Sequence, residues 1–141
     1  MGHFIRELDQ IGYDIIGASF NVRKQVGRGL LEKLYESALS YELSQKGYKV
    51  ERQVAIPAIY KGQEIQDAYR ADIIVERKVI IEVKAISHME SIERCQLYTY
   101  LKLSDYKLGY LINFGTRDFQ VGILEEDGPL TLGIYRMVNN L

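Results

Sequence analysis

The sequence predicts a mixed α/β (α+β) fold, in which helices pack against a central sheet. Three observations predict it. Apolar residues recur at helical intervals in the first third of the chain, short β-branched runs follow, and helical spacing returns before the last strands. A length of 141 residues with 47% hydrophobic residues fits a single domain over residues 1–141 with one core.

Two helices are expected at the start of the chain. Apolar side chains three and four residues apart predict a helix over about residues 4–26. They are Phe4, Ile5, Leu8, Ile11, Ile15, Ala18, Val22 and Val26. The glycines around Arg28 break this pattern. A second apolar stripe then predicts a helix that stops at Gly47, a glycine just past its end.

Strands are expected next. Alternation of apolar and polar residues from Tyr48 to Ile56 predicts a half-exposed strand that ends before Pro57. A Lys61-Gly62 turn signal predicts a short hairpin between residues 59–60 and 64–65. Residues 69–75 and 79–84 are rich in β-branched side chains and are joined by three residues, so we expect two antiparallel neighbours.

The last part of the chain predicts one helix and three strands. Helical spacing returns at residues 92–103, and a buried strand is expected at 107–113. Two further strands are expected at 119–124 and 132–138, with a turn at 125–129 between them.

Composition narrows the function classes. A formal charge of −1 lacks the strong basic excess of avid, non-specific nucleic-acid binders. No apolar run approaches the roughly 18 residues needed to span a bilayer, so we expect no membrane insertion. Cys95 is the single cysteine, which excludes an internal disulfide, and the first ten residues lack the apolar region of a secretory signal. These features favour a cytoplasmic location.

The strands expected at 69–75 and 79–84 carry the charged residues that are candidates for a catalytic site. Residues two apart in a strand share a face, so Glu82 and Lys84 point the same way. The same rule places Arg70, Asp72 and Ile74 on one face of their strand and Ala71, Ile73 and Val75 on the other. A loop centred at Arg77 pairs residues whose numbers sum to 154, so Asp72 is expected opposite Glu82, and Arg70 opposite Lys84.

Two opposed carboxylates repel each other unless a cation holds both ionised. Mg²⁺ fits, because it prefers carboxylate oxygens and water and leaves positions for phosphate oxygens. Lys84 would then position a water molecule or stabilise the transition state. The alternative is a solvated, salt-bridged sheet face. Apolar residues on both faces of the two strands argue against that alternative.

Other candidate residues lie on the helices. Glu32 stands in the first turns of the second helix, where simple stabilisation by the helix dipole is the alternative role. Tyr35 follows at i+3, with core packing as its alternative. Gln96 and Tyr100 are spaced i,i+4, so both project from one helix face and can hydrogen-bond water, Lys84 or phosphate.

The residues 29–35, GLLEKLY, resemble the signature of the GxxExxY proteins. Five further segments resemble that family in order and spacing: ESALSYEL, ERQVAIPAIYKG, YRADIIVERKVIIEVKA, QLYTYLKL and GYLINFG. The similarity spans about residues 8–115 and resumes at GIYRMVN.

The resemblance implies a branch of the PD-(D/E)xK nuclease superfamily, related to its RecB-like nucleases, with a restriction-endonuclease-like core in the order α-β-β-β-α-β around Mg²⁺ or Mn²⁺. It implies four roles in the metal site: Glu32 as the acidic residue of the first core helix, Asp72 as the metal-bridging aspartate, Glu82 with Lys84 as the E-x-K element, and the Val83 backbone carbonyl facing the metal. Gln96 and Tyr100 resemble a Q-x-x-x-Y element.

The expected function is metal-dependent hydrolysis of phosphodiester bonds in DNA or RNA. Substrate contacts are expected from Arg28, Tyr35 and Arg70, and steering from the nearby cations Arg23, Lys24, Arg77 and Lys78. The competing hypothesis is a non-catalytic, metal-binding regulatory or protein-interaction module with the same fold.

Two expectations concern less regular parts of the chain. Residues 116–132 form a longer segment than the family leads us to expect, and we predict an extra hairpin, a dimer surface or a substrate rim there. His88 follows the second charged strand, where a surface role competes with an approach to the metal or substrate. A homodimer would present two sites to two strands.

Overall fold

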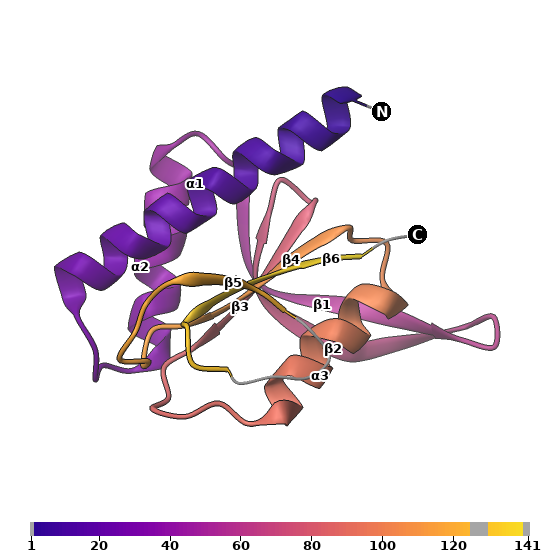
Figure 1. The fold of residues 1–141 in the computed structure, drawn as a ribbon. Helices are drawn as coiled ribbons and strands as arrows, with labels where there is room; N and C mark the ends of the chain where they lie inside the picture. Colours follow the sequence, from indigo (N-terminus) through magenta and orange to yellow (C-terminus); the bar gives the residue numbers. More distant parts are fainter. Residues whose placement is uncertain (1, 125–129, 140–141) are drawn as a thin grey trace.

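The computed structural model describes residues 2–124 and 130–139. A six-stranded mixed sheet forms the centre, with the strand order β1-β2-β3-β4-β6-β5. The elements along the chain are α1 (Gly2–Val26), α2 (Glu32–Gln45), β1 (Val50–Tyr60), β2 (Gln63–Val75), β3 (Val79–Lys84), α3 (Ser91–Leu103), β4 (Leu108–Asn113), β5 (Val121–Ile123) and β6 (Ile134–Val138). The predicted α-β-β-β-α-β order is confirmed from α2 to β4 (Figure 1).

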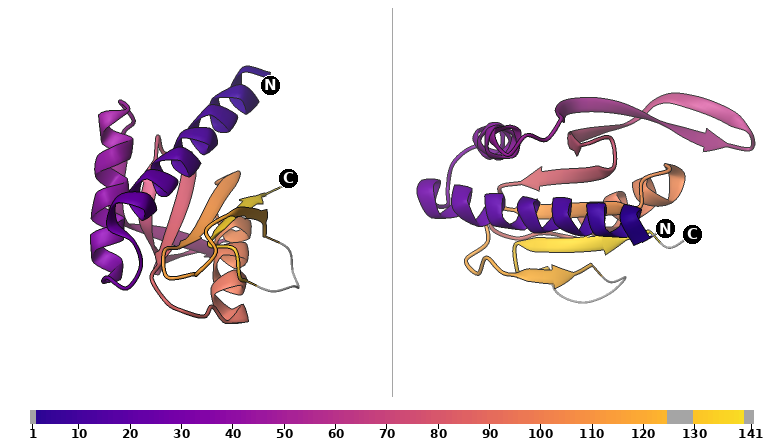
Figure 2. Two further views of the ribbon diagram at one scale, coloured as in Figure 1. Left: turned by 60° about the vertical axis from the view of Figure 1, so that its left-hand side comes forward. Right: turned by 90° about the horizontal axis from the view of Figure 1, so that it is seen from above.

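Helices cover both faces of the sheet, which makes three layers (Figures 1 and 2). The first core packs α1 and α2 against one face through buried residues such as Ile15, Leu39 and Ile81. The second core packs α3 against the other face through Leu97, Leu101 and Ile80. The central strands β3 and β4 are therefore apolar on both sides, as expected for strands buried between two helical layers.

The register of β2 and β3 agrees with the prediction wherever the two strands are hydrogen-bonded as a ladder. Ile73 pairs with Ile81 and Val75 with Val79, so the paired numbers sum to 154. Because α3 crosses over between β3 and β4, these two strands run parallel, and Lys84 lies beside Asn113. The carboxyl ends of β3 and β4 consequently share one edge of the sheet.

The first two strands differ from the prediction. Instead of a strand, a short hairpin and another strand, β1 and β2 form one long hairpin that reaches beyond the rest of the sheet (Figure 1). Pro57 lies where the register shifts between Ile56 and Ala58, so its missing N–H disturbs no regular ladder bond. Lys61 and Gly62 both have positive φ, as a tight hairpin turn requires.

The predicted sharing of one face by Ala71, Ile73 and Val75 is wrong for Ala71. Ile73 and Val75 belong to the core under α1 and α2, but Ala71 belongs to the core under α3. The regular alternation is interrupted at Asp72, opposite Gln53, which has a φ of 50°. An irregular residue in one strand changes the side to which the following side chains point.

The strand in the segment 116–132, β5, does not form a hairpin with the following strand, β6. Its strand β5 pairs with β6 in parallel, whereas the arms of a hairpin are antiparallel. The predicted turn at 125–129 lies outside the described residues. Among the helices that the structure describes, none is long and apolar enough to cross a membrane.

Candidate functional site

A fork between β2 and β3 brings two carboxylates together. The regular ladder runs as far as Ile73 and Ile81, and side chains continue the pairing beyond that point. The backbone N–H of Asp72 donates to Glu82 Oε1 at 3.2 Å, and the N–H of Val83 donates to Asp72 Oδ2 at 2.8 Å. Asp72 and Glu82 therefore lie opposite each other, as the sequence predicted, but each carboxylate is bound to the other strand's backbone.

The Val83 carbonyl is directed into the same fork. In an extended strand the N–H and C=O of one residue point to the same side. The N–H of Val83 points toward Asp72, so its carbonyl does as well. The next residue confirms the alternation, because the carbonyl of Lys84 turns to β4 and accepts the N–H of Phe114 at 2.8 Å.

The positive charge of Lys84 acts on three carboxylates, although Lys84 forms no ion pair within 4 Å with any of them. Its charge lowers the pKa of Glu32, Asp72 and Glu82 against the factors that raise them. These three acidic residues come from α2, β2 and β3. The structure thus brings together the four side chains that the sequence predicted for the site.

Glu82 has the most strongly shifted carboxyl group. Burial and then repulsion by Asp72 raise its pKa from 4.5 to about 7, against hydrogen bonds from the Tyr69 hydroxyl and the Asp72 N–H and the charge of Lys84. The Glu82 carboxyl group is therefore partly protonated near neutral pH when no other cation is bound.

Asp72 and Glu32 also have raised pKa values. Burial raises the pKa of Asp72, and the hydrogen bonds from Val83 and Gln53 oppose it. For Glu32, loss of hydration around the carboxylate raises the pKa, with added repulsion from Asp72, although the side chain as a whole is exposed at the start of α2. All three acids of the site consequently favour a compensating positive charge.

Sequence reasoning missed a network that holds Asp72. Glu36 is only 6% exposed and forms an ion pair with Arg52 at 2.9 Å. Gln53 Nε2 donates to Glu36 Oε1 at 2.8 Å and to Asp72 Oδ1 at 3.2 Å. The spacing of Glu32 and Glu36, one helical turn apart, was the available signal. Nothing in the sequence signalled the left-handed φ of Gln53 that directs its amide to Asp72.

Tyr69 was also missed, and it connects α3 to the fork. Its hydroxyl donates to Glu82, and its ring stacks on Tyr100 with centroids 3.3 Å apart. The pKa of Tyr100 is raised by burial and then by the charge of Glu82, which places this tyrosine beside the site. Gln96 lies on α3, one turn before Tyr100, and its side chain is exposed.

Tyr35 does not have the predicted role in substrate binding. Its side chain is fully buried, and it stacks on Phe114 at 4.7 Å. Its hydroxyl donates to the Gly27 carbonyl at 2.7 Å and accepts the Leu30 N–H at 3.2 Å. A fully buried ring with a satisfied hydroxyl cannot contact substrate, so Tyr35 instead fixes the α1–α2 connection.

The predicted steering cations divide between two ends of the sheet. Arg70 is exposed and donates to the Gln53 carbonyl at 2.8 Å, which keeps it near the fork, although it is not paired with Lys84 in the ladder. Arg77 and Lys78 lie at the β2–β3 turn, the far end of β3 from Lys84, where each forms an ion pair with a glutamate. These two residues therefore lie away from the fork, and their part in steering the substrate stays a prediction.

Two more candidates have different surroundings. Arg28 is exposed, and its Nε donates to the Gly115 carbonyl at 3.2 Å, near the carboxyl end of β4. His88 is exposed, and its Nε2 lies 3.7 Å from Glu90 Oε1 at the start of α3.

The oxygen atoms of the fork fit a divalent cation. In residues 2–124 and 130–139 no three Asp, Glu, His or Cys side chains form a ready metal-binding group. Two facing carboxylates and the Val83 carbonyl nevertheless match Mg²⁺, which commonly takes one or two carboxylates and completes its shell with water and substrate oxygens. The oxygen-rich donor set fits Mg²⁺ or Mn²⁺ better than it fits a softer metal.

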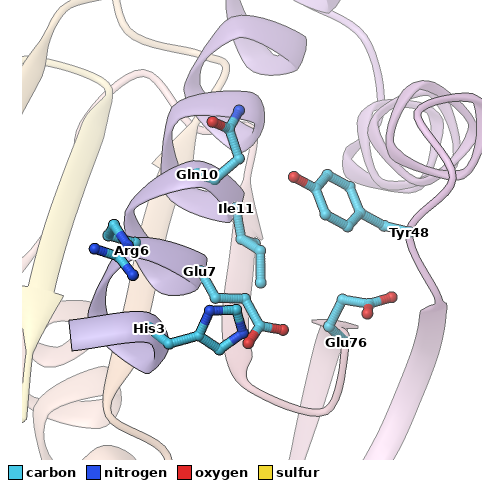
Figure 3. Close-up of a pocket in the computed structure, with 7 residues that line it drawn as sticks. All are labelled: His3, Arg6, Glu7, Gln10, Ile11, Tyr48 and Glu76. Carbon is cyan, nitrogen blue, oxygen red and sulfur yellow. The ribbon is translucent and has the colours of Figure 1, made fainter. Parts of the chain in front are cut away.

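A groove lies next to the fork, beside the start of α2. It has a volume of about 630 Å³ and is lined by Glu32, Lys33, Glu36, Arg52 and Gln53. A second cavity of about 510 Å³ lies between the first half of α1 and the residues Tyr48 and Glu76; the Tyr48 ring is directed toward the helix (Figure 3). This second cavity contains none of the predicted site residues.

One comparison with known proteins gives a match. A family model described as the PD-(D/E)XK nuclease superfamily matches residues 9–125, which include α2, β1–β3, α3 and β4. Comparisons with curated proteins and with solved structures gave no significant match.

Proposed function

Because this chain belongs to the PD-(D/E)XK nuclease superfamily, we propose that it hydrolyses phosphodiester bonds of DNA or RNA with Mg²⁺ or Mn²⁺ held in the β2–β3 fork. The observation that carries the proposal is the facing pair Asp72 and Glu82, each bound to the backbone of the opposite strand, with the charge of Lys84 beside them.

Asp72, Glu82, Glu32 and the Val83 backbone carbonyl would hold the cation. When bound, the metal lowers the pKa of a coordinated water and offsets charge that develops at phosphorus. The fork fixes both carboxylates before substrate arrives, since the hydrogen bonds to the backbone leave them little freedom to rotate.

Lys84 would orient the attacking water and stabilise negative charge on the phosphate oxygens as it develops. Its position supports this role, because it interacts with all three acidic residues and stands at the edge of the sheet. Tyr100 would hydrogen-bond a water or phosphate oxygen at the α3 side, with Gln96 one turn before it. Arg70 would contact the phosphate backbone.

We further assign the chain to the GxxExxY group and to the RecB-like branch on its quoted motifs. A cytoplasmic location and a homodimer remain predictions. We also propose that residues 1–141 form one domain.

The test combines metal binding with cleavage. Calorimetric titration of Mn²⁺ should show binding to the wild type that weakens about tenfold or more in Asp72→Asn, because a ligand of the cation is lost. Cleavage of labelled single- and double-stranded DNA and RNA should fall by about 10² to 10³-fold in Lys84→Ala, while Mn²⁺ binding remains. Glu64→Gln, an exposed change in the β1–β2 hairpin, is the matched control for loss of a carboxylate.

Two outcomes would contradict the proposal. Metal binding without cleavage of any of the four substrates would favour the non-catalytic regulatory module. Wild-type and Asp72→Asn proteins that both fail to bind Mn²⁺ would identify the fork as a charged sheet face without a metal.

A further inference from the structure

Two arginines lie together at the edge of the sheet that carries Lys84. Arg23 comes from the last turn of α1, and Arg28 from the connection to α2. Arg23 Nη2 donates to the Arg117 carbonyl at 3.1 Å, and Arg28 Nε donates to the Gly115 carbonyl at 3.2 Å. Both guanidinium groups are thus anchored on the same turn after β4.

That turn is adjacent to the proposed active site. Lys84 pairs with Asn113, and the Asn113 side chain exchanges hydrogen bonds with the backbone of Ile86. The connections α1–α2, β3–α3 and β4–β5 gather at one end of the molecule, at the lower left of Figure 1. The arginine pair, Arg23 and Arg28, is therefore anchored on the turn that directly follows the β4 residues beside Lys84.

Among the residues that the structure describes, none supplies a carboxylate that neutralises the arginine pair. In the described ranges, no Asp or Glu oxygen lies within 4 Å of either guanidinium group, whereas Arg52, Arg77 and Arg136 each have such a partner. The two positive charges oppose each other, and burial with repulsion by Arg28 lowers the pKa of Arg23. Two like charges held together without a counter-charge are unfavourable unless an anion joins them.

Arg23 is held in a fixed orientation. Its guanidinium lies 4.9 Å from the centre of the Phe119 ring, and Phe119 packs edge-to-face against Phe20. One of its nitrogens, Nη1, is buried and has no hydrogen-bond partner in the part of the chain that the structure describes. The stacking on Phe119 and the hydrogen bond to Arg117 hold this guanidinium beside Arg28, and they leave Nη1 as a donor without a partner among the described residues.

We infer that Arg23 and Arg28 form a phosphate-binding subsite, which holds a backbone phosphate of the nucleic-acid strand next to the one that is cleaved. The identity of the substrate rests on the proposed nuclease function. Arginine is suited to this contact because its planar group binds phosphate with two parallel hydrogen bonds. The contact carries no sequence information, so it would fix the register of the strand on the site.

The test measures binding without cleavage. Fluorescence anisotropy of labelled single-stranded DNA, RNA and duplex DNA is followed from 50 to 200 mM salt, with Asp72→Asn as the parent so that the strands stay intact. Arg23→Met with Arg28→Met should weaken binding about tenfold for each arginine lost. The slope of log affinity against log salt should become less negative by about 1.4 to 1.8.

Arg6→Met is the matched control, because Arg6 is an exposed arginine at the other end of α1 (Figure 3), and it should leave the slope unchanged. Arg28→Met alone tests the subsite in a variant that should keep its fold, because the Arg28 side chain is exposed. It should make the slope less negative by about 0.7 to 0.9. Arg23→Lys with Arg28→Lys should keep the slope and lose affinity, because lysine retains the charge but not the paired hydrogen bonds.

Each outcome decides one point. Slopes that agree among the parent, the double Met variant and Arg6→Met would overturn the subsite, whatever the cleavage assay shows. A parent that binds none of the three ligands would overturn it too. A changed slope in the double variant, together with a wild type that cleaves nothing, would support the phosphate subsite and remove the nuclease activity.

Discussion

At the scale of single residues, Glu82 determines how the fork responds to pH. Its pKa of about 7 in the folded protein exceeds the usual 4.5, so the folded state binds more protons than the unfolded state between these values. Stability therefore falls as the pH rises through this window and is lower above it. The same proton-binding preference explains why a divalent cation would be bound more tightly as the pH rises.

We predict that, in the presence of a chelator, the free energy of unfolding of the wild type decreases by about 3 kcal/mol between pH 4.5 and 8 through this group. Urea denaturation at several pH values measures it. Glu82→Gln should remove most of this decrease and be the more stable protein at pH 8, because no charge is buried beside Asp72. Parallel pH profiles for the wild type and Glu82→Gln would contradict the assignment, with Glu64→Gln as the exposed control.

The residues of β2 and β3 that face each other could be predicted, because the period of two and the short loop fix the register of these two strands. The pairing of Asp72 with Glu82 required no tertiary information. Gln53 and Tyr69 could not be predicted, since their contacts depend on an irregular residue in β1 and on the packing of α3. Tyr35 was misassigned because a motif position does not reveal whether a ring is buried.

At the scale of elements, the parallel pair β3 and β4 fixes the position of Lys84. The turn after β4 lies against the connection after β3 so closely that only glycine fits at position 115. A Cβ on Gly115 would lie 2.4 Å from the carbonyl oxygen of Ile86 and 2.6 Å from its nitrogen. These distances involve backbone atoms, which cannot rotate away as a side chain does.

Gly115→Ala should therefore lower the free energy of unfolding by about 1 to 3 kcal/mol. Gly17→Ala is the matched control, because this helical glycine is exposed and its added Cβ meets nothing within 4 Å. It should raise stability by up to about 1 kcal/mol through helix propensity. Chemical denaturation of both variants measures the difference, and a Gly115→Ala protein as stable as the wild type would refute the close packing.

Most helices and strands could be predicted because each has a regular apolar period. The long hairpin of β1 and β2 could not, because beyond Ile56 and Tyr69 its residues are mostly exposed and lack a buried face. Proline in β1 was interpreted as an end of the strand, but a register shift accommodates it. The parallel pairing of β5 with β6 was missed because alternation in short strands does not indicate their direction.

At the scale of the whole molecule, two cores share one sheet. Tyr35 and Tyr110 report on the core under α1 and α2, and Tyr69 and Tyr135 on the core under α3. Since β3 and β4 contribute residues to both cores, neither core can lose its packing without disturbing the other.

We predict one cooperative unfolding transition. Tyrosine fluorescence, which is unobscured because the chain has no tryptophan, and far-ultraviolet circular dichroism should give the same midpoint in urea. Separate midpoints would show that the two cores unfold independently and that the chain is not a single domain.

The long β1–β2 hairpin also places its tight turn far from the β2–β3 fork. Lys61 and Gly62 stand at the tip of an arm that extends away from the rest of the sheet, while the fork lies at its base beyond Tyr69 (Figure 2). Exposed turns of this kind tolerate added sequence, because no buried contact depends on them. A foreign recognition module joined at this tip would be carried at a distance from Asp72, which makes the arm a natural attachment point for giving the domain a new target.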